Sequence, residues 1–286
     1  MKLYDCLYPH DRPFTPRAPL PGMVDVLVDG QRFYAIKPNT GGARDPSRYD
    51  AAEARKWPTL SPGALVVVNI ESRADRIGEP HRPLRSDVRI HVGRDISNDC
   101  AFIRQVIADV RIGSETAPVG LYGILPTGYN VFNSVITNDT NELRRSQIAN
   151  DYLALELIEC FDTLHPSLYV NSTNIQHWQR FARWQVDECR RLSRAYGIGL
   201  PIIPFISPEI HPSAGRGLIS PEFWTTQVKT LRDLGCDGAV LWYSSANCTM
   251  KQIRPYADMA TAAIGPVVDT MKHGDATAAF APRRAD

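Results

Sequence analysis

The chain has 286 residues, of which 43% are hydrophobic and 22% are charged, and its formal net charge is +1. This balance is typical of a globular protein, and it predicts one domain over residues 1–272, followed by a small, polar, disordered tail over 273–286. Because 32 Lys and Arg residues nearly balance 31 Asp and Glu residues, nothing indicates a nucleic acid or an anionic membrane as a partner.

The sequence also argues against several other classes of protein. No window approaches the roughly 20 apolar residues that span a bilayer, and the start, MKLYDCLYPHDRP, lacks the apolar core of a signal peptide. We therefore expect a soluble chain without an export signal, whose compartment and oligomeric state the sequence leaves open. The six cysteines contain no CxxC pair, and the GxGxxG, P-loop and HExxH motifs are absent, so no cofactor and no metal is predicted.

Short apolar runs alternate with longer segments of helical periodicity along the chain. In residues 174–196, apolar side chains recur at steps of three, four and seven positions, which predicts an amphipathic helix. The segment SPEFWTTQVKTLRDLG predicts another helix, with Ser220 as N-cap, Pro221 at the first helical position and Gly235 just past the end. The apolar runs predict strands at about residues 2–8, 33–37 with a second candidate at 24–28, 64–70, 118–123, 167–170, 200–206 and 238–243.

Repeated strand and helix units predict a parallel sheet, either closed into a barrel or doubly wound. Polar and aromatic side chains recur at the C-terminal ends of the predicted strands, where a TIM-type barrel builds its active site. We therefore predict an α/β fold, a TIM-type (β/α) barrel with about seven or eight parallel strands. The residues at these ends are Asn69, Glu71, Tyr122, Tyr129, Tyr169, Asn171, Ser207, Glu209, Trp242 and Tyr243.

The stretch GALVVVNIES, residues 63–72, holds the strongest candidate for catalysis. Its valine run is typical of a strand buried on both faces, and it ends on Asn69 and Glu71. Side chains two positions apart in a strand share a face, so the amide and the carboxyl group are expected side by side. A carboxyl group at the mouth of an apolar strand loses solvation, which favours its protonated form, as a general acid requires. The alternative is that Glu71 caps a helix or pairs with Arg73 or Arg76.

Five segments, taken in order across residues 60–245, resemble the hyaluronidases. They are VVVNIES, PVGLYGILPTGYN, LHPSLYVN, LPIIPFIS and LRDLGCDGAVLWYSS, and RFYAIKPNTGG resembles an earlier strand of that family more weakly. The resemblance implies an irregular (β/α) barrel, a glycosidase activity and Glu71 as the proton donor. Three features depart from the family pattern: Asn69 stands where the family has Asp, the Arg after strand six is absent, and the family's cysteine framework is not reproduced.

Cleavage of a glycosidic bond needs a carboxylic acid that protonates the leaving oxygen and a group that stabilises the positive charge at the sugar carbon. Glu71 suits the first role. For the second role the resemblance implies substrate assistance, in which the 2-acetamido oxygen of the sugar attacks and Asn69 orients that amide. The alternative is Glu209 as a second carboxylate, acting as nucleophile or as base for water.

Aromatic side chains near the strand ends favour a carbohydrate partner, since their flat faces stack on sugar rings and their polar edges bind hydroxyls. We therefore predict a glycoside hydrolase that cleaves a polysaccharide or glycan, with N-acetylhexosamine as a candidate unit. The rivals are a non-catalytic carbohydrate-binding barrel, a two-carboxylate glycosidase, and a lyase or transglycosylase. The candidates for substrate binding are Tyr122, Tyr129, Tyr169, Asn171, Glu209, Trp242 and Tyr243, and for each aromatic residue the alternative role is core packing.

Overall fold

The computed structural model describes residues 1–6, 23–29, 34–36, 44–69, 94–114, 116–127, 131–211, 214–215, 217–243 and 249–264. Seven parallel strands form its central sheet, in the order β7-β6-β5-β2-β1-β9-β8. These strands are β1 (Lys2–Cys6), β2 (Val24–Asp29), β5 (Leu65–Val68), β6 (Val119–Tyr122), β7 (Thr163–His165), β8 (Phe205–Ile206) and β9 (Gly238–Trp242).

The two outer strands of this order, β7 and β8, meet and close the sheet into a barrel. Leu164 forms a parallel bridge with Ile202, and Ser167 forms another with Phe205. The backbone N–H of Phe205 donates to the carbonyl oxygen of Pro166 at 2.9 Å. The predicted TIM-type barrel is therefore confirmed, with seven strands and an irregular seam between β7 and β8.

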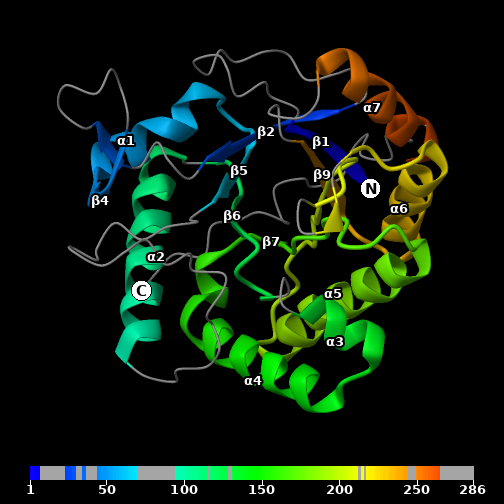
Figure 1. Ribbon diagram of the computed structural model, residues 1–286. Coiled ribbons are helices and arrows are strands. Elements are labelled where there is room, and N and C mark those ends of the chain that lie inside the picture. Colours follow the sequence, from blue (N-terminus) through cyan, green and yellow to red (C-terminus); the bar gives the residue numbers. More distant parts are fainter. Residues whose placement is uncertain are drawn as a thin grey trace.

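Helices surround the barrel, as Figure 1 shows. A short antiparallel pair, β3 (Tyr34–Ile36) and β4 (Arg44–Tyr49), lies apart from the barrel sheet. The helices are α1 (Ala51–Lys56), the 3-10 turn η1 (Trp57–Leu60), α2 (Arg94–Gly113), α3 (Phe132–Thr137), α4 (Thr140–Leu157), the 3-10 turn η3 (Ile158–Cys160), α5 (Ile175–Ala195), α6 (Pro221–Asp233) and α7 (Met250–Ile264).

The two helices predicted in most detail form as expected. In α6, the Ser220 hydroxyl accepts a hydrogen bond from the backbone N–H of Phe223, Pro221 stands in the first turn, and Gly235 adopts a positive φ of 67° just past the end. In α5, the apolar stripe packs on the barrel, and the indole N–H of the fully buried Trp178 donates to the carbonyl oxygen of Leu168 at 2.9 Å.

Two strand predictions differ from the structure. The ladder strand β7 lies at Thr163–His165 rather than at residues 167–170, which follow it as extended chain with isolated bridges. The inward side chains of β7 are those of Thr163 and His165. This strand therefore lacks the apolar run on which the strand predictions depend. The run predicted at 33–37 contains β3 of the separate hairpin, and the second candidate at 24–28 is the barrel strand β2.

The side chains of the barrel strands alternate between two apolar clusters. Val67 and Val240 belong to a cluster that contains no residue of a described helix and therefore fills the barrel interior. Their neighbours Val66 and Leu241 belong to a larger cluster that includes the helices, and so lie between the barrel and the helix layer. This period of two follows from the pleat of a strand, and it decides which side chains can reach the barrel mouth.

Candidate active site

One layer of the mainly apolar barrel interior holds a buried polar pair. Thr163 Oγ1 lies 2.7 Å from His165 Nε2, and both residues are buried. His165 Nδ1 lies 2.9 Å from the carbonyl oxygen of Ile203, which can only accept, so Nδ1 carries the proton and Nε2 accepts from Thr163. Burial lowers the pKa of His165 to about 4, which keeps the ring neutral. Gly120 makes room for this pair, because a Cβ there would lie 2.3 Å from His165 Nε2.

Above this layer, aromatic rings from four neighbouring strands or strand ends form a continuous wall. The ring centroids of Tyr122 and Phe205 are 4.6 Å apart, and those of Tyr122 and Tyr169 are 6.1 Å apart. Tyr169 stacks on Trp242 with centroids 5.3 Å apart and planes inclined by 27°. Tyr122, Tyr169, Phe205 and Trp242 are called the aromatic wall below.

The members of the aromatic wall differ in exposure. Tyr122 and Phe205 are buried, whereas Tyr169 and Trp242 are half-buried and keep part of each ring accessible. The Tyr122 hydroxyl lies 3.0 Å from the Ser167 hydroxyl, which holds its ring in place. Tyr169 and Trp242 therefore present the accessible stacking surface, and the two buried rings support it from within the barrel.

Asn69 follows the last residue of β5 and lies at the mouth. Leu65 and Val67 of this strand point into the barrel, and Asn69 is the next residue in that alternation. Its side chain is half-buried. Glu71 and Tyr129, the other two candidates from these loops, lie outside the described residues.

Glu209 and Asn171 follow the ends of β8 and β7. Glu209 is buried, with 9% of its surface exposed, and its backbone N–H donates to the Ser207 hydroxyl at 3.1 Å. Asn171 is half-buried, and its side-chain amide donates to the carbonyl oxygen of Tyr169 at 3.3 Å. Both residues lie at the C-terminal edge of the barrel, the edge at which the aromatic wall also lies.

Tyr243 does not join the other candidates. It is 1% exposed and belongs to the cluster between the barrel and the helices, whereas its neighbour Trp242 packs against the inner cluster. The difference of one residue puts the two rings on opposite faces of β9.

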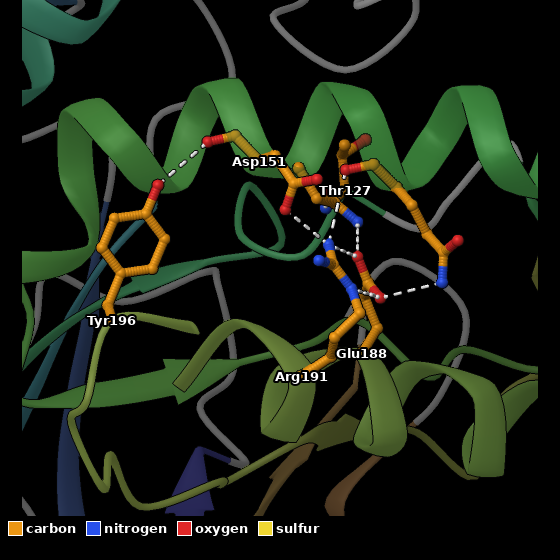
Figure 2. Close-up of polar contacts among 7 residues, drawn as sticks. Thr127, Asp151, Glu188, Arg191 and Tyr196 are labelled. Atoms are coloured by element: carbon orange, nitrogen blue, oxygen red, sulfur yellow. Dashed lines mark hydrogen bonds and ion pairs between the residues drawn. The ribbon is translucent and has the colours of Figure 1, made fainter. Parts of the chain in front are cut away.

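A polar network in the helix layer anchors the chain that follows β6, as Figure 2 shows. The backbone N–H of Thr127 donates to Asn150 Oδ1 at 2.8 Å, and the Asn150 amide donates to Glu188 Oε1 at 2.9 Å. Arg191 donates to both oxygens of Glu188 at 2.8 Å and lies 2.7 Å from Asp151 Oδ1. Helices α4 and α5 thus fix the start of the segment that leads to Tyr129.

Within the described ranges, no group of three or more His, Cys, Asp or Glu side chains could hold a metal ion. The cysteines that the structure describes are free thiols. None of the described helices combines the length and the apolar character that crossing a membrane requires.

Comparison with known proteins identifies the barrel by its fold. No protein-family profile matches the sequence, and no curated protein matches it. Bee venom hyaluronidase in complex with a hyaluronic acid tetramer is 17% identical, with a TM-score of 0.55 over 85% of this chain and 86% of that chain. A monoclinic crystal structure of the same bee protein is 14% identical, with a TM-score of 0.60 over 92% of this chain and 99% of that chain.

The barrel has the hyaluronidase fold. This confirms, for the fold, the resemblance that the five sequence segments indicated. The irregular seam between β7 and β8 agrees with the irregular barrel that the resemblance implied.

Three residues of the site were missed by the sequence analysis, namely His165, Ser167 and Phe205. A signal for two of them was present in LHPSLYVN, where His165, Ser167, Tyr169 and Asn171 recur at every second position. The apolar residues of this segment lie mostly in its second half, so the predicted strand at 167–170 contains only part of the inward row.

Proposed function

We propose that this protein is a glycoside hydrolase that cleaves a polysaccharide or glycan at the barrel mouth. The observation that carries the proposal is the aromatic wall, whose accessible rings, Tyr169 and Trp242, lie at the strand ends on the same side as Asn69. Flat apolar rings with polar edges suit the faces of sugars. The hyaluronidase fold supports the same class of substrate, since the bee protein is found in complex with a hyaluronic acid tetramer.

Glu71 is the proposed general acid. It comes two residues after Asn69, so an extended chain gives both side chains the same face. The buried strand β5 ends one residue before Asn69, and a carboxyl group that loses solvation at the mouth of an apolar strand is favoured in the protonated form that the leaving oxygen needs.

The proposed nucleophile belongs to the substrate. The carbonyl oxygen of the sugar's 2-acetamido group attacks the anomeric carbon while the glycosidic bond breaks, and the leaving oxygen takes the proton of Glu71. The resulting Glu71 carboxylate then removes a proton from water, which attacks the same carbon and reopens the cyclic intermediate. Asn69 orients the acetamido group through its side-chain amide. The proposed substrate therefore contains N-acetylhexosamine, and the anomeric configuration is retained.

A two-carboxylate mechanism is the second candidate, and the position of Glu209 favours it. Glu209 is a buried carboxyl group three residues after the end of β8, where it could act as nucleophile or base together with Glu71. Retention would need the two carboxyl groups roughly 5 to 5.5 Å apart, and inversion about 6.5 to 9.5 Å.

Product analysis and inhibition separate these proposals. Hydrolysis of an N-acetylhexosamine polymer produces new reducing ends, elimination produces an unsaturated sugar, and a binding protein produces neither. Substrate assistance predicts that a thiazoline analogue of the cyclised N-acetyl sugar inhibits and that Glu209→Gln keeps substantial turnover. A glycosyl ester trapped on Glu209, or good turnover of sugars without the acetamido group, would assign the second mechanism.

A further inference from the structure

The chain that leaves β6 at the barrel mouth is held by side chains at its start and farther along. We call residues 123–127 the β6 loop. Just before it, the Tyr122 hydroxyl lies 3.0 Å from the Ser167 hydroxyl. At its other end, the backbone N–H of Thr127 donates to Asn150 Oδ1 of α4 at 2.8 Å. Loops at this end of a TIM-type barrel carry the groups that bind the substrate, so contacts that fix the β6 loop bear on the candidate site.

Asn150 can bind the β6 loop with only one orientation of its amide. The amide nitrogen donates to Glu188 Oε1 at 2.9 Å, and an ionised carboxylate can only accept. The amide oxygen is therefore left to face the backbone N–H of Thr127, which can only donate. Arg191 holds the charge on Glu188 by donating to both of its oxygens, as Figure 2 shows. The carboxylate of α5 thus decides which end of the Asn150 amide meets the β6 loop.

Burial makes this arrangement costly. Asn150 is fully buried, and Glu188 is 2% exposed. Apolar residues of similar size often stabilise a protein as well as a buried ion pair does, so stability alone does not explain the polar groups. Hydrogen bonds add direction, because a donor and an acceptor bind over a narrow range of distances and angles. Such bonds suit a side chain that fixes a loop in one position.

We propose that Asn150, oriented by Glu188 and Arg191, is a positioning residue of the sugar-binding site and holds the β6 loop in one conformation at the barrel mouth. This inference rests on the proposed function. Asn150 acts through the β6 loop rather than by touching the sugar. The loop begins directly after Tyr122, whose ring lies 6.1 Å from that of Tyr169. A displaced loop therefore shifts the support of the accessible stacking surface.

An exchange of amide and carboxylate tests the orientation of Asn150. Asn150→Asp keeps an oxygen toward Thr127 but puts a second carboxylate against Glu188, whereas Asn150→Asp combined with Glu188→Gln restores a donor between the two side chains and the total charge of the wild type. Amide hydrogen exchange of the β6 loop should become at least about tenfold faster in the single variant and return toward the wild-type rate in the double variant. An unchanged rate in the single variant would overturn the tether, and a double variant that exchanges as fast as the single one would overturn the amide orientation.

Sugar affinity separates positioning from a general loss of stability. The probes are a hyaluronic acid tetramer and an N-acetylglucosamine tetramer. Asn150→Asp should weaken the tighter of the two complexes by about tenfold, and the double variant should regain most of the loss. Val228→Ala, on the buried face of α6, is the matched control, since it loses stability through a core cavity and should keep the wild-type affinity while folded. Affinity that simply follows melting temperature across these variants would overturn the positioning role.

The same titrations distinguish failure of this inference from failure of the proposed function. A wild type that binds neither probe would overturn both the N-acetylhexosamine substrate and the role of Asn150 in binding it. A wild type that binds a probe, with Asn150→Asp binding equally well, would overturn the role of Asn150 alone.

Discussion

The inside of the barrel and the layer between barrel and helices are built from the same strands, yet they differ in chemistry. The outer layer is packed with apolar side chains, both aliphatic and aromatic, such as Val66 and Trp178. The interior combines an apolar cluster with the buried polar side chains of Thr163 and His165. These polar groups are tolerated inside because they are hydrogen-bonded: His165 contacts the Thr163 hydroxyl and the carbonyl oxygen of Ile203. The alternation of side chains along a strand therefore decides whether a residue packs in the outer layer or faces the barrel interior, where the candidate site lies.

Two tryptophans, one from each region, offer the sharpest test of this difference. Trp178 of the outer layer is fully buried, so Trp178→Ala should cost about 3 to 5 kcal/mol of unfolding free energy through the cavity that it leaves. Trp242 at the mouth is half-buried, so Trp242→Ala should destabilise the protein less but weaken sugar binding. Thermal unfolding and glycan-binding titrations measure both effects. A larger loss of stability from Trp242→Ala, with unchanged affinity, would assign Trp242 to the fold.

Substitutions in the polar network of Figure 2 measure how much buried polar groups of the helix layer contribute to the free energy of unfolding. Glu188→Gln removes a buried charge that binds Asn150 and Arg191, and we expect a loss of about 1 to 3 kcal/mol in chemical denaturation. Asp187→Asn is the matched control on the same helix, since the exposed Asp187–Arg190 ion pair should contribute less than about 1 kcal/mol. Equal effects of the two substitutions would argue against a structural role of the network.

His165 makes the barrel interior sensitive to acid. Its pKa in the folded protein is about 4, below the value of about 6.5 for an unfolded His, so the unfolded chain binds more protons between these two values. The contribution of His165 to stability is therefore complete above pH 6.5 and is lost as the pH falls toward 4. We expect a loss of about 1 to 2 kcal/mol between pH 7 and pH 5. His165→Gln should flatten this dependence, and an unchanged slope would contradict the assignment.

The barrel and two of its helices could be predicted from the sequence because their signals are local. The valine run of β5 and the Ser220, Pro221 and Gly235 signals of α6 depend on nearest neighbours, and the structure confirms them. The aromatic residues Tyr122, Tyr169 and Trp242 could be predicted as a group because parallel strands bring their C-terminal ends to one edge.

The remaining features depend on contacts between distant parts of the chain. Strand β7 contains Thr163 and His165, which become compatible with burial only through each other and the carbonyl oxygen of Ile203. The orientation of Tyr243 depends on the phase of β9, which an apolar run on both faces does not reveal. The Asn150–Glu188 contact joins residues 38 positions apart, and no local pattern indicates it.

Turnover of Glu71→Gln tests the proposed chemistry most directly. The amide has the shape of the carboxyl group but cannot supply its proton, so turnover of an N-acetylhexosamine polymer should fall by about 10² to 10⁴-fold while glycan binding and melting temperature stay near the wild-type values. Glu222→Gln, on the exposed first turn of α6, is the matched control and should keep full activity. Near wild-type turnover by Glu71→Gln, on a substrate with a poor leaving group, would contradict the assignment of Glu71 as the general acid.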